Sequence, residues 1–267
     1  MALTVHHLNC GTLCPRRPAW LGAATPLVCH CLLIETAAGL VLVDTGLGRA
    51  EIQRRALSPL IDALSPPRYH LAETAHAQIQ ALGYTPEDVR HIILTHLDRD
   101  HAGGLSDFPR ARVHLHAHEY SGGVSQPNLL ERMRYAARQW QHQPQWVTYT
   151  PTGERWFGLE AVRALEGLPE EILLIPLRGH TRGHSGVAVH SAEGWLLHAG
   201  DAFFDQRQIV GGRYPADLLL FQILEPWSLR HWHHSLHNLR TLAEHQPELR
   251  LFCSHDPTTL PSGKEYL

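Results

Sequence analysis

A short polar stretch carries four side chains that can bind a metal ion. Their imidazole and carboxylate groups lie within six positions, in the segment Thr95-His96-Leu97-Asp98-Arg99-Asp100-His101. Such groups are the usual protein ligands of zinc, iron and manganese. The apolar run Ile92-Ile93-Leu94 precedes the segment, and Gly103-Gly104 follows it. We therefore expect a metal centre on a loop that follows a buried strand, with these candidate ligands: His96, Asp98, Asp100 and His101.

Three further candidate ligands also follow apolar runs. His180 comes after the run 171–177, Asp201 after 195–198 and His255 after 249–253. Loops at one edge of a sheet can bring residues that are distant in the sequence into one cleft. Each of these residues alone would be ordinary, but their common position at strand ends predicts a single composite site.

The segment Asp44-Thr45-Gly46 closes another apolar run, 40–43. A strand that ends in this way has two interpretations. An aspartic-protease nucleophile would need a second such motif or a dimer, and the sequence contains no second motif. We favour the other interpretation, in which Asp44 is a carboxylate that supports a nearby site.

Histidine is over-represented, with 22 residues, and most of them cannot be ligands. His114 and His116 alternate on a predicted strand and share one face. Because no carboxylate motif lies beside them, we interpret both as structural. Four others lie on a helix predicted for 228–245, where we expect them at the surface: His231, His233, His234 and His237.

The five cysteines suggest no standard metal site. Cys10, Cys14, Cys29 and Cys31 would be sufficient for a four-thiolate zinc site. Their spacing, however, is not that of a zinc ribbon or finger, and the last two fall in a predicted strand. We expect reduced thiols, as in a cytoplasmic protein.

Length and charge narrow the class of protein. A chain of 267 residues can bury a sizeable core in one domain. The net charge of −3 argues against nucleic acid as a partner. No apolar run is long enough to span a membrane, and the first residues show no signal peptide. These features favour a cytoplasmic protein with no nucleic-acid or membrane partner.

Apolar periodicity and turn residues predict the remaining elements. We expect a loop over 9–26 and strands at 3–8, 27–35, 40–43, 92–94, 111–116, 171–177, 186–190, 195–198 and 249–253. We expect helices at 49–64, 71–82 and 228–245, another beginning at Thr85, and a pair within 117–140 broken at Gly122-Gly123. The aromatic residues between 120 and 157 either pack in the core or form a lid over an apolar substrate group.

These motifs resemble those of the metallo-β-lactamase superfamily, whose metal motif is H-x-H-x-D-H. Here it stands as His96-Leu97-Asp98-Arg99-Asp100-His101, with Asp98 in place of the second histidine. Later motifs of the family match Gly179-His180-Thr181, Gly200-Asp201 and Ser254-His255-Asp256. The resemblance implies an α/β fold, a four-layer αβ/βα sandwich, over residues 1–267 as a single domain.

Carried over position by position, the resemblance implies two divalent metal ions. One would take His96, Asp98 and His180, the other would take Asp100, His101 and His255, and Asp201 would bridge them. Zinc is the default, but an aspartate at position 98 makes iron or manganese possible. His184 and Asp44 would orient ligands.

Within the superfamily, the chain is most similar to the quorum-quenching, acyl-homoserine-lactonase-like hydrolases. This implies a hydrolase in which a metal-bridging hydroxide cleaves an ester, lactone or thioester of a small-molecule substrate, with Asp100 or Asp201 passing the proton. Those lactonases place a tyrosine three residues after the bridging aspartate, where this sequence has Phe204. Flavodiiron proteins carry a carboxylate at the position of Asp98, so the alternative is a diiron oxidoreductase or oxygen-handling protein. A metal-binding protein without catalysis is a third alternative.

Overall fold

The structure is a computed structural model that describes residues 3–16, 25–55, 65–215, 218–219, 222–223 and 226–261. A six-stranded sheet takes the first part of the chain, in the order β1-β2-β3-β4-β5-β6. Its strands are Thr4–Leu13, Leu27–Thr36, Gly39–Val43, Val89–Ile93, Arg112–His116 and Gln145–Tyr149. β1, β2 and β3 pair antiparallel, and β3 to β6 run parallel.

A four-stranded sheet takes the second part, in the order β12-β11-β10-β9. Along the chain these are β9 Ile172–Pro176, β10 Ser185–Ser191, β11 Gly194–His198 and β12 Arg250–Phe252. β12 is parallel to β11, and the other pairs are antiparallel. The small hairpin of β7 Arg155–Trp156 and β8 Leu159–Glu160 stands apart from both sheets.

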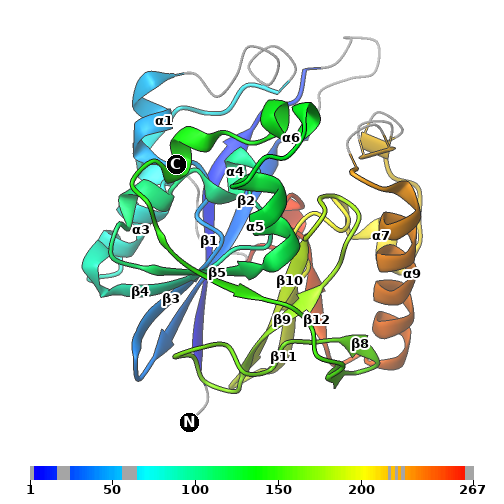
Figure 1. The fold of residues 1–267 in the computed structure, drawn as a ribbon. Helices are drawn as coiled ribbons and strands as arrows, with labels where there is room; N and C mark the ends of the chain where they lie inside the picture. The colour runs from blue at the N-terminus through cyan, green and yellow to red at the C-terminus, as the bar shows by residue number, and fades with distance from the viewer. Residues whose placement is uncertain are drawn as a thin grey trace.

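Helices cover the outer face of each sheet (Figure 1). The α-helices are α1 Arg49–Arg54, α3 Ala75–Ala81, α4 Arg99–Ala102, α5 Ala117–Gly123, α6 Leu129–Arg134, α7 Arg207–Val210 and α9 Leu229–His245. Short 3-10 helices are η2 Leu71–Glu73, η3 Pro86–Asp88, η4 Leu105–Asp107, η5 Ala137–Trp140 and η6 Pro257–Thr259. No helix among the described residues is long and apolar enough to cross a bilayer.

Alternating side chains divide the core into layers, because successive residues of a strand face opposite sides of the sheet. Leu32 and Ile34 pack between the sheets against Leu174, whereas Leu33 packs outward in the cluster that includes Ile79 of α3. On the other sheet, Leu173 and Ile175 face the apolar side of α9. The resulting order is helices, sheet, sheet, helix, so the predicted four-layer αβ/βα sandwich is confirmed.

The predicted loop over residues 9–26 is wrong in its first part. β1 continues to Leu13, and Thr12 and Leu13 pair with Val28 and Leu27 of β2 after a shift in register. Gly11 signalled a turn, but it lies inside the strand. A Cβ there would approach the Leu47 side chain to 2.9 Å, so its glycine accommodates a close contact. Residues 17–24 lie outside the described residues.

The predicted helix beginning at Thr85 is also wrong. Thr85 and Asp88 form a capping box, but the helix is only the single turn η3, because the β-branched Val89 begins β4. α1 ends at Arg54, and 56–64 lie outside the described residues. The predicted helix pair within 117–140 is present, but the break follows α5 rather than falling at its glycines.

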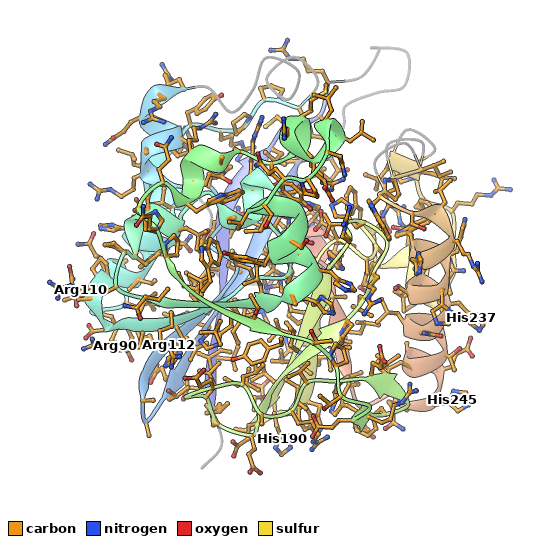
Figure 2. All side chains as sticks on the ribbon, in the orientation of Figure 1. Arg90, Arg110, Arg112, His190, His237 and His245 are labelled. Atoms are coloured by element: carbon orange, nitrogen blue, oxygen red, sulfur yellow. The ribbon has the colours of Figure 1, made fainter. Side chains whose placement is uncertain are left out.

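Most of the aromatic residues between 120 and 157 pack in the core rather than forming a lid, although Phe157 is exposed. Tyr135 and Trp140 are buried in the cluster between the larger sheet and its helices. Tyr120 and Trp146 pack against this cluster. Trp156 is buried beside the smaller sheet. The histidines predicted at the surface of the long helix are exposed there, and Figure 2 shows His237 at the periphery of α9.

His114 supplies a pH-dependent contribution to stability. Its ring is fully buried, with 2.9 Å from Nε2 to Nδ1 of His91 and 2.8 Å from Nδ1 to the Tyr149 hydroxyl. Burial lowers the pKa of His114 to about 3. The unfolded chain therefore binds a proton that the folded chain excludes, so this contribution is complete above pH ~6.5 and is lost as pH falls toward 3.

We expect the His114→Gln variant to lose this dependence. Between pH 7 and 5, the free energy of unfolding should fall by about 2 kcal/mol more in the wild type than in the variant. Urea titrations at both pH values measure the difference. The exposed His237→Gln change is the matched control and should follow the wild type. Equal slopes in wild type and His114→Gln would contradict the prediction.

Candidate metal centre

Backbone hydrogen bonds join the loops that carry the candidate ligands. The Ser185 N–H, at the end of the 177–184 loop, donates to the Thr95 carbonyl at 2.9 Å. The Ser254 N–H, after β12, donates to the Gly200 carbonyl at 3.0 Å. The loops therefore meet at one edge of the two sheets, and the structure brings all seven candidate ligands together there.

The first group of candidate ligands is His96, His180 and Asp201. One ligand atom from each lies within 4.8 Å of the others, and all three residues are buried. Asp201 Oδ2 is 3.5 Å from His180 Nε2 and 3.9 Å from His96 Nε2. Imidazole, imidazole and carboxylate make a typical set for zinc or another first-row transition metal.

The second group is Asp100, His101 and His255, which are equally close together. Asp100 Oδ2 is 3.7 Å from His101 Nε2 and 3.6 Å from His255 Nε2. Asp201 also contacts this group, with Oδ1 3.3 Å from His101 Nε2 and Oδ2 3.0 Å from His255 Nε2. Its carboxylate is thus the one ligand that faces both groups, consistent with a binuclear metal site.

Three buried polar atoms of the centre form no well-aligned hydrogen bond, as expected of atoms that could bind metal ions. They are Nε2 of His96, Nε2 of His101 and Oδ1 of Asp201, and their nearest polar contacts are ion-pair distances of 3.3 Å or more. Buried polar atoms are rarely left unsatisfied in this way. In addition, two ligand atoms about 2.0–2.1 Å from a tetrahedral ion lie about 3.3–3.4 Å apart, close to the separations found in both groups. The geometry therefore suits two ions.

Asp98 lies beside the first group, but the closely spaced triad does not include it. Its Oδ2 is 3.3 Å from His96 Nε2 and 3.1 Å from His180 Nε2. The same carboxylate pairs with Arg134 of α6, whose Nε donates to Oδ1 at 2.7 Å and whose Nη2 donates to Oδ2. Burial would raise the pKa of Asp98, but Arg134 and the neighbouring imidazoles hold it well below its usual range.

Hydrogen bonds behind the imidazoles aim their Nε2 atoms into the centre. Nδ1 of His255 lies 2.8 Å from the Val28 carbonyl, and Nδ1 of His101 lies 2.8 Å from Asp44 Oδ2. Asp44 also accepts from the Thr95 N–H and hydroxyl at 2.8 and 2.7 Å. Carbonyl and carboxylate partners of this kind fix the orientation of metal-binding histidines. Asp44 is therefore positioned as a supporting carboxylate.

His184 supports the loop that carries Asp201. Its Nδ1 lies 2.8 Å from the Leu177 carbonyl, and its Nε2 accepts from the Asp201 N–H at 2.9 Å. The ring is fully buried, and burial holds the pKa of His184 well below its usual value, so the ring is neutral. A neutral imidazole can donate through one nitrogen and accept through the other, as both contacts require.

Glu119 is a supporting residue that sequence reasoning missed. Its carboxylate is fully buried and accepts from the Leu97 N–H at 2.9 Å and the Gly183 N–H at 3.0 Å. It also accepts from the hydroxyls of Thr181 at 2.6 Å and Tyr135 at 3.0 Å. Glu119 thereby ties the loop of His96 to the loop of His180. Its place just after the end of β5 follows the strand-end pattern that identified the other residues.

Charge is tightly coupled within the centre. Burial would raise the pKa of Asp201, but His255 and His101 lower it well below its usual range. Conversely, burial would lower the pKa of His255, but Asp201 and Asp100 raise it to about 9. The Asp201 carboxylate is therefore ionised and strongly favours positive charge beside it.

Phe204 occupies the position where the resemblance suggested a tyrosine. Its ring centroid lies 4.8 Å from that of His255 and 6.1 Å from that of His180, so it packs against both groups. The side chain is buried and carries no hydroxyl. The five cysteines are free thiols, and neither group of candidate ligands contains one.

Comparison with known proteins agrees with this description. The sequence model of the metallo-beta-lactamase superfamily matches residues 24–255. A probable metallo-hydrolase of Mycobacterium tuberculosis is 42% identical over 258 residues, which cover 95% of this chain and 80% of that protein. An N-acyl homoserine lactonase of a Bacillus species is 24% identical over 172 residues, 64% of this chain and 61% of the lactonase.

A solved structure shows the same fold. It is an N-acyl homoserine lactone hydrolase with the product N-hexanoyl-L-homoserine bound at its catalytic metal centre. The two chains have a TM-score of 0.74 at 18% identity, covering 100% of this chain and 98% of the other. The fold and the resemblance expected from the motifs are thus confirmed.

We expect the Glu119→Gln variant to be less stable by about 3 kcal/mol. Glutamine keeps the size of the side chain, but its NH₂ group must face two of the four donors. Urea unfolding measures the loss, and the exposed Glu87→Gln change is the matched control. If Glu119→Gln were as stable as this control, Glu119 would not hold the two loops together.

Proposed function

The chain belongs to the metallo-β-lactamase superfamily, and we propose that it is a binuclear metallo-hydrolase that cleaves an ester, lactone or thioester of a small molecule. One observation carries the proposal. The Asp201 carboxylate faces both groups of candidate ligands, with atom separations of 3.0 to 3.9 Å. The name of the mycobacterial relative supports hydrolysis of some kind.

Two divalent ions, when bound here, would supply a nucleophile at neutral pH and polarise the substrate carbonyl. We propose zinc, which suits this mixture of imidazole and carboxylate. Asp201 would contact both ions. The residues that would hold one ion are His96, Asp98 and His180, and those that would hold the other are Asp100, His101 and His255.

Asp100 and Asp201 are our candidates for moving the proton to the leaving group. The Asp100 side chain is 20% exposed, whereas that of Asp201 is 4% exposed. Asp100 is therefore the more exposed of the two carboxylates, and we propose that it faces the side from which a leaving alkoxide or thiolate would depart. A positioned carboxylate of this kind contributes about 10²- to 10⁴-fold to a proton-transfer step.

The similarity to N-acyl homoserine lactonases favours an acyl compound as the substrate. This chain, however, has Phe204 at the position where those lactonases have a tyrosine. With no phenol at this position, the ring offers only an apolar surface beside His180 and His255. The substrate class that we propose therefore includes open-chain esters and thioesters as well as lactones.

A diiron oxidoreductase is the second candidate, and Asp98 is the feature that favours it. A carboxylate there is a harder ligand than imidazole and is better suited to iron or manganese. Arg134, however, offsets the charge of this carboxylate. Elemental analysis separates the two functions. Zinc in the purified protein, with no iron-dependent oxygen uptake, would reject the oxidoreductase.

We expect the purified protein to hold two metal ions per chain and to hydrolyse at least one substrate in a panel of lactones, thioesters and aryl esters. Asp201→Asn should lower kcat more than about 100-fold, because even partners behind the ligands contribute 10- to 100-fold. Asp88→Asn, in the η3 turn, is the matched control. Full activity after chelation, or in Asp201→Asn, would reject the proposal.

The Phe204→Tyr variant tests the substrate class. A hydroxyl at this ring would lie beside both groups and could donate to developing negative charge, so we expect kcat/KM for lactones to rise about tenfold or more. Phe204→Leu, which adds no donor, should bring no such gain. If the ratio of lactone to aryl-ester turnover is the same in Phe204→Tyr and wild type, this ring position does not select lactones.

A further inference from the structure

Arg134 makes a two-point contact with the one ligand position where this chain departs from its family. Its Nε and Nη2 each donate to a different oxygen of Asp98, so the guanidinium grips the carboxylate as a fork. The Asp98 side chain is 13% exposed and that of Arg134 is 21% exposed. An ion pair this close to the interior is only weakly screened by water and salt.

This contact fixes the direction of the Asp98 carboxylate. Oδ1 accepts from Arg134 Nε and Oδ2 accepts from Arg134 Nη2. Oδ2 also lies 3.3 Å from His96 Nε2 and 3.1 Å from His180 Nε2. A carboxylate can rotate and offer either oxygen to a cation. Here the two-point contact fixes the plane of the carboxylate, with Oδ2 on the side of the two imidazoles of the first group.

The contact also balances charge. The three carboxylates of Asp98, Asp100 and Asp201 gather within one centre, where a neutral histidine at position 98 would leave only two. Asp98 and Arg134 together carry no net charge, as a neutral imidazole would. The pair therefore keeps the net charge of a site with a second histidine. An unchanged net charge would preserve the Lewis acidity of ions bound there.

Two neighbouring contacts hold Arg134 in place. Glu131, one turn earlier on α6, pairs at 2.8 Å with Arg182 on the loop that carries His180. Tyr135, the next residue, donates to the buried Glu119 at 3.0 Å. The end of α6 is thus attached to the same loops as the candidate ligands, so Arg134 is not a mobile surface side chain.

We propose that Arg134 is a positioning residue for the first metal group, which neutralises Asp98 and directs its Oδ2 toward His96 and His180. This rests on the proposed binuclear centre. A competing arrangement is that the guanidinium itself takes the place of one ion, because Arg134 Nη2 also lies 2.8 Å from His180 Nε2. The two arrangements differ in how many ions the protein binds.

The test measures metal binding rather than turnover. Zn²⁺ content by mass spectrometry, calorimetric titration of the chelated protein and the visible spectrum of the Co²⁺ form are recorded for the wild type and four variants. These are Arg134→Met, Asp98→His, the double change Asp98→His/Arg134→Met, and Arg132→Met. Arg132 is exposed on the same helix, so Arg132→Met is the matched control.

We expect two ions in the wild type and in the control. Arg134→Met should weaken one of the two by about 10- to 100-fold, the usual effect of losing a partner behind a ligand. Asp98→His should also weaken it, because an unneutralised guanidinium then faces the site. The double variant should bind this ion more tightly than Asp98→His does. A merely structural role of Arg134 would not produce this rescue.

Each contrary result has a distinct meaning. If Arg134→Met binds both ions as tightly as the wild type, or if the double variant is no better than Asp98→His, Arg134 is not a positioning residue. If the wild type binds one ion and Arg134→Met binds two, the guanidinium replaces an ion and the proposal is overturned. If the wild type binds none, the proposed binuclear function itself fails. Arg134→Met alone leaves the Asp98 carboxylate without its guanidinium and could fail to fold, whereas the double variant also removes that carboxylate. In that case the comparison of Asp98→His with the double variant decides.

Discussion

The main constraint on the structure is that three carboxylates lie close together at a mostly buried edge of the sandwich. Asp201 is 4% exposed and lies within 3.0 to 3.3 Å of two imidazole nitrogens, with Asp100 and Asp98 close by. An ionised carboxylate without water is stable only when positive charge or donors surround it. The Arg134 guanidinium supplies positive charge, the backbone of the loops supplies hydrogen-bond donors, and ions at the candidate metal sites would supply further positive charge.

A layer of buried hydrogen bonds makes the arrangement rigid. Asp44 joins the end of β3 to the segment after β4, Glu119 joins that segment to the His180 loop, and His184 holds the Asp201 backbone. Each of these residues therefore connects two structural segments that are distant in the sequence. A centre of this kind needs such support, because misplacing ligands by about 1 Å costs much of the binding and catalysis they provide.

The sequence predicted the candidate ligands because each follows an apolar run, and local patterns of this kind can be read directly. The four layers followed from the resemblance, and the strand alternation agrees with them. Arg134 could not be found in this way, since nothing in its spacing links it to Asp98, which lies 36 residues earlier. Glu119 also lies just after the end of a strand, so the same pattern could have identified it as a residue of the site. The length of β1 was missed because Gly11 serves a close contact there instead of a turn.

The position of Asp201 also has a consequence for how the molecule assembles. His96 and His101 extend from the larger sheet, whereas Asp201 and His255 follow strands of the smaller one. The centre is therefore complete only when the two halves of the chain have docked, and bringing together segments so distant in the sequence is entropically costly. An ion held by both halves would act as a cross-link across the seam of the sandwich. Metal supply would then influence how long the folded chain persists as well as what it can do.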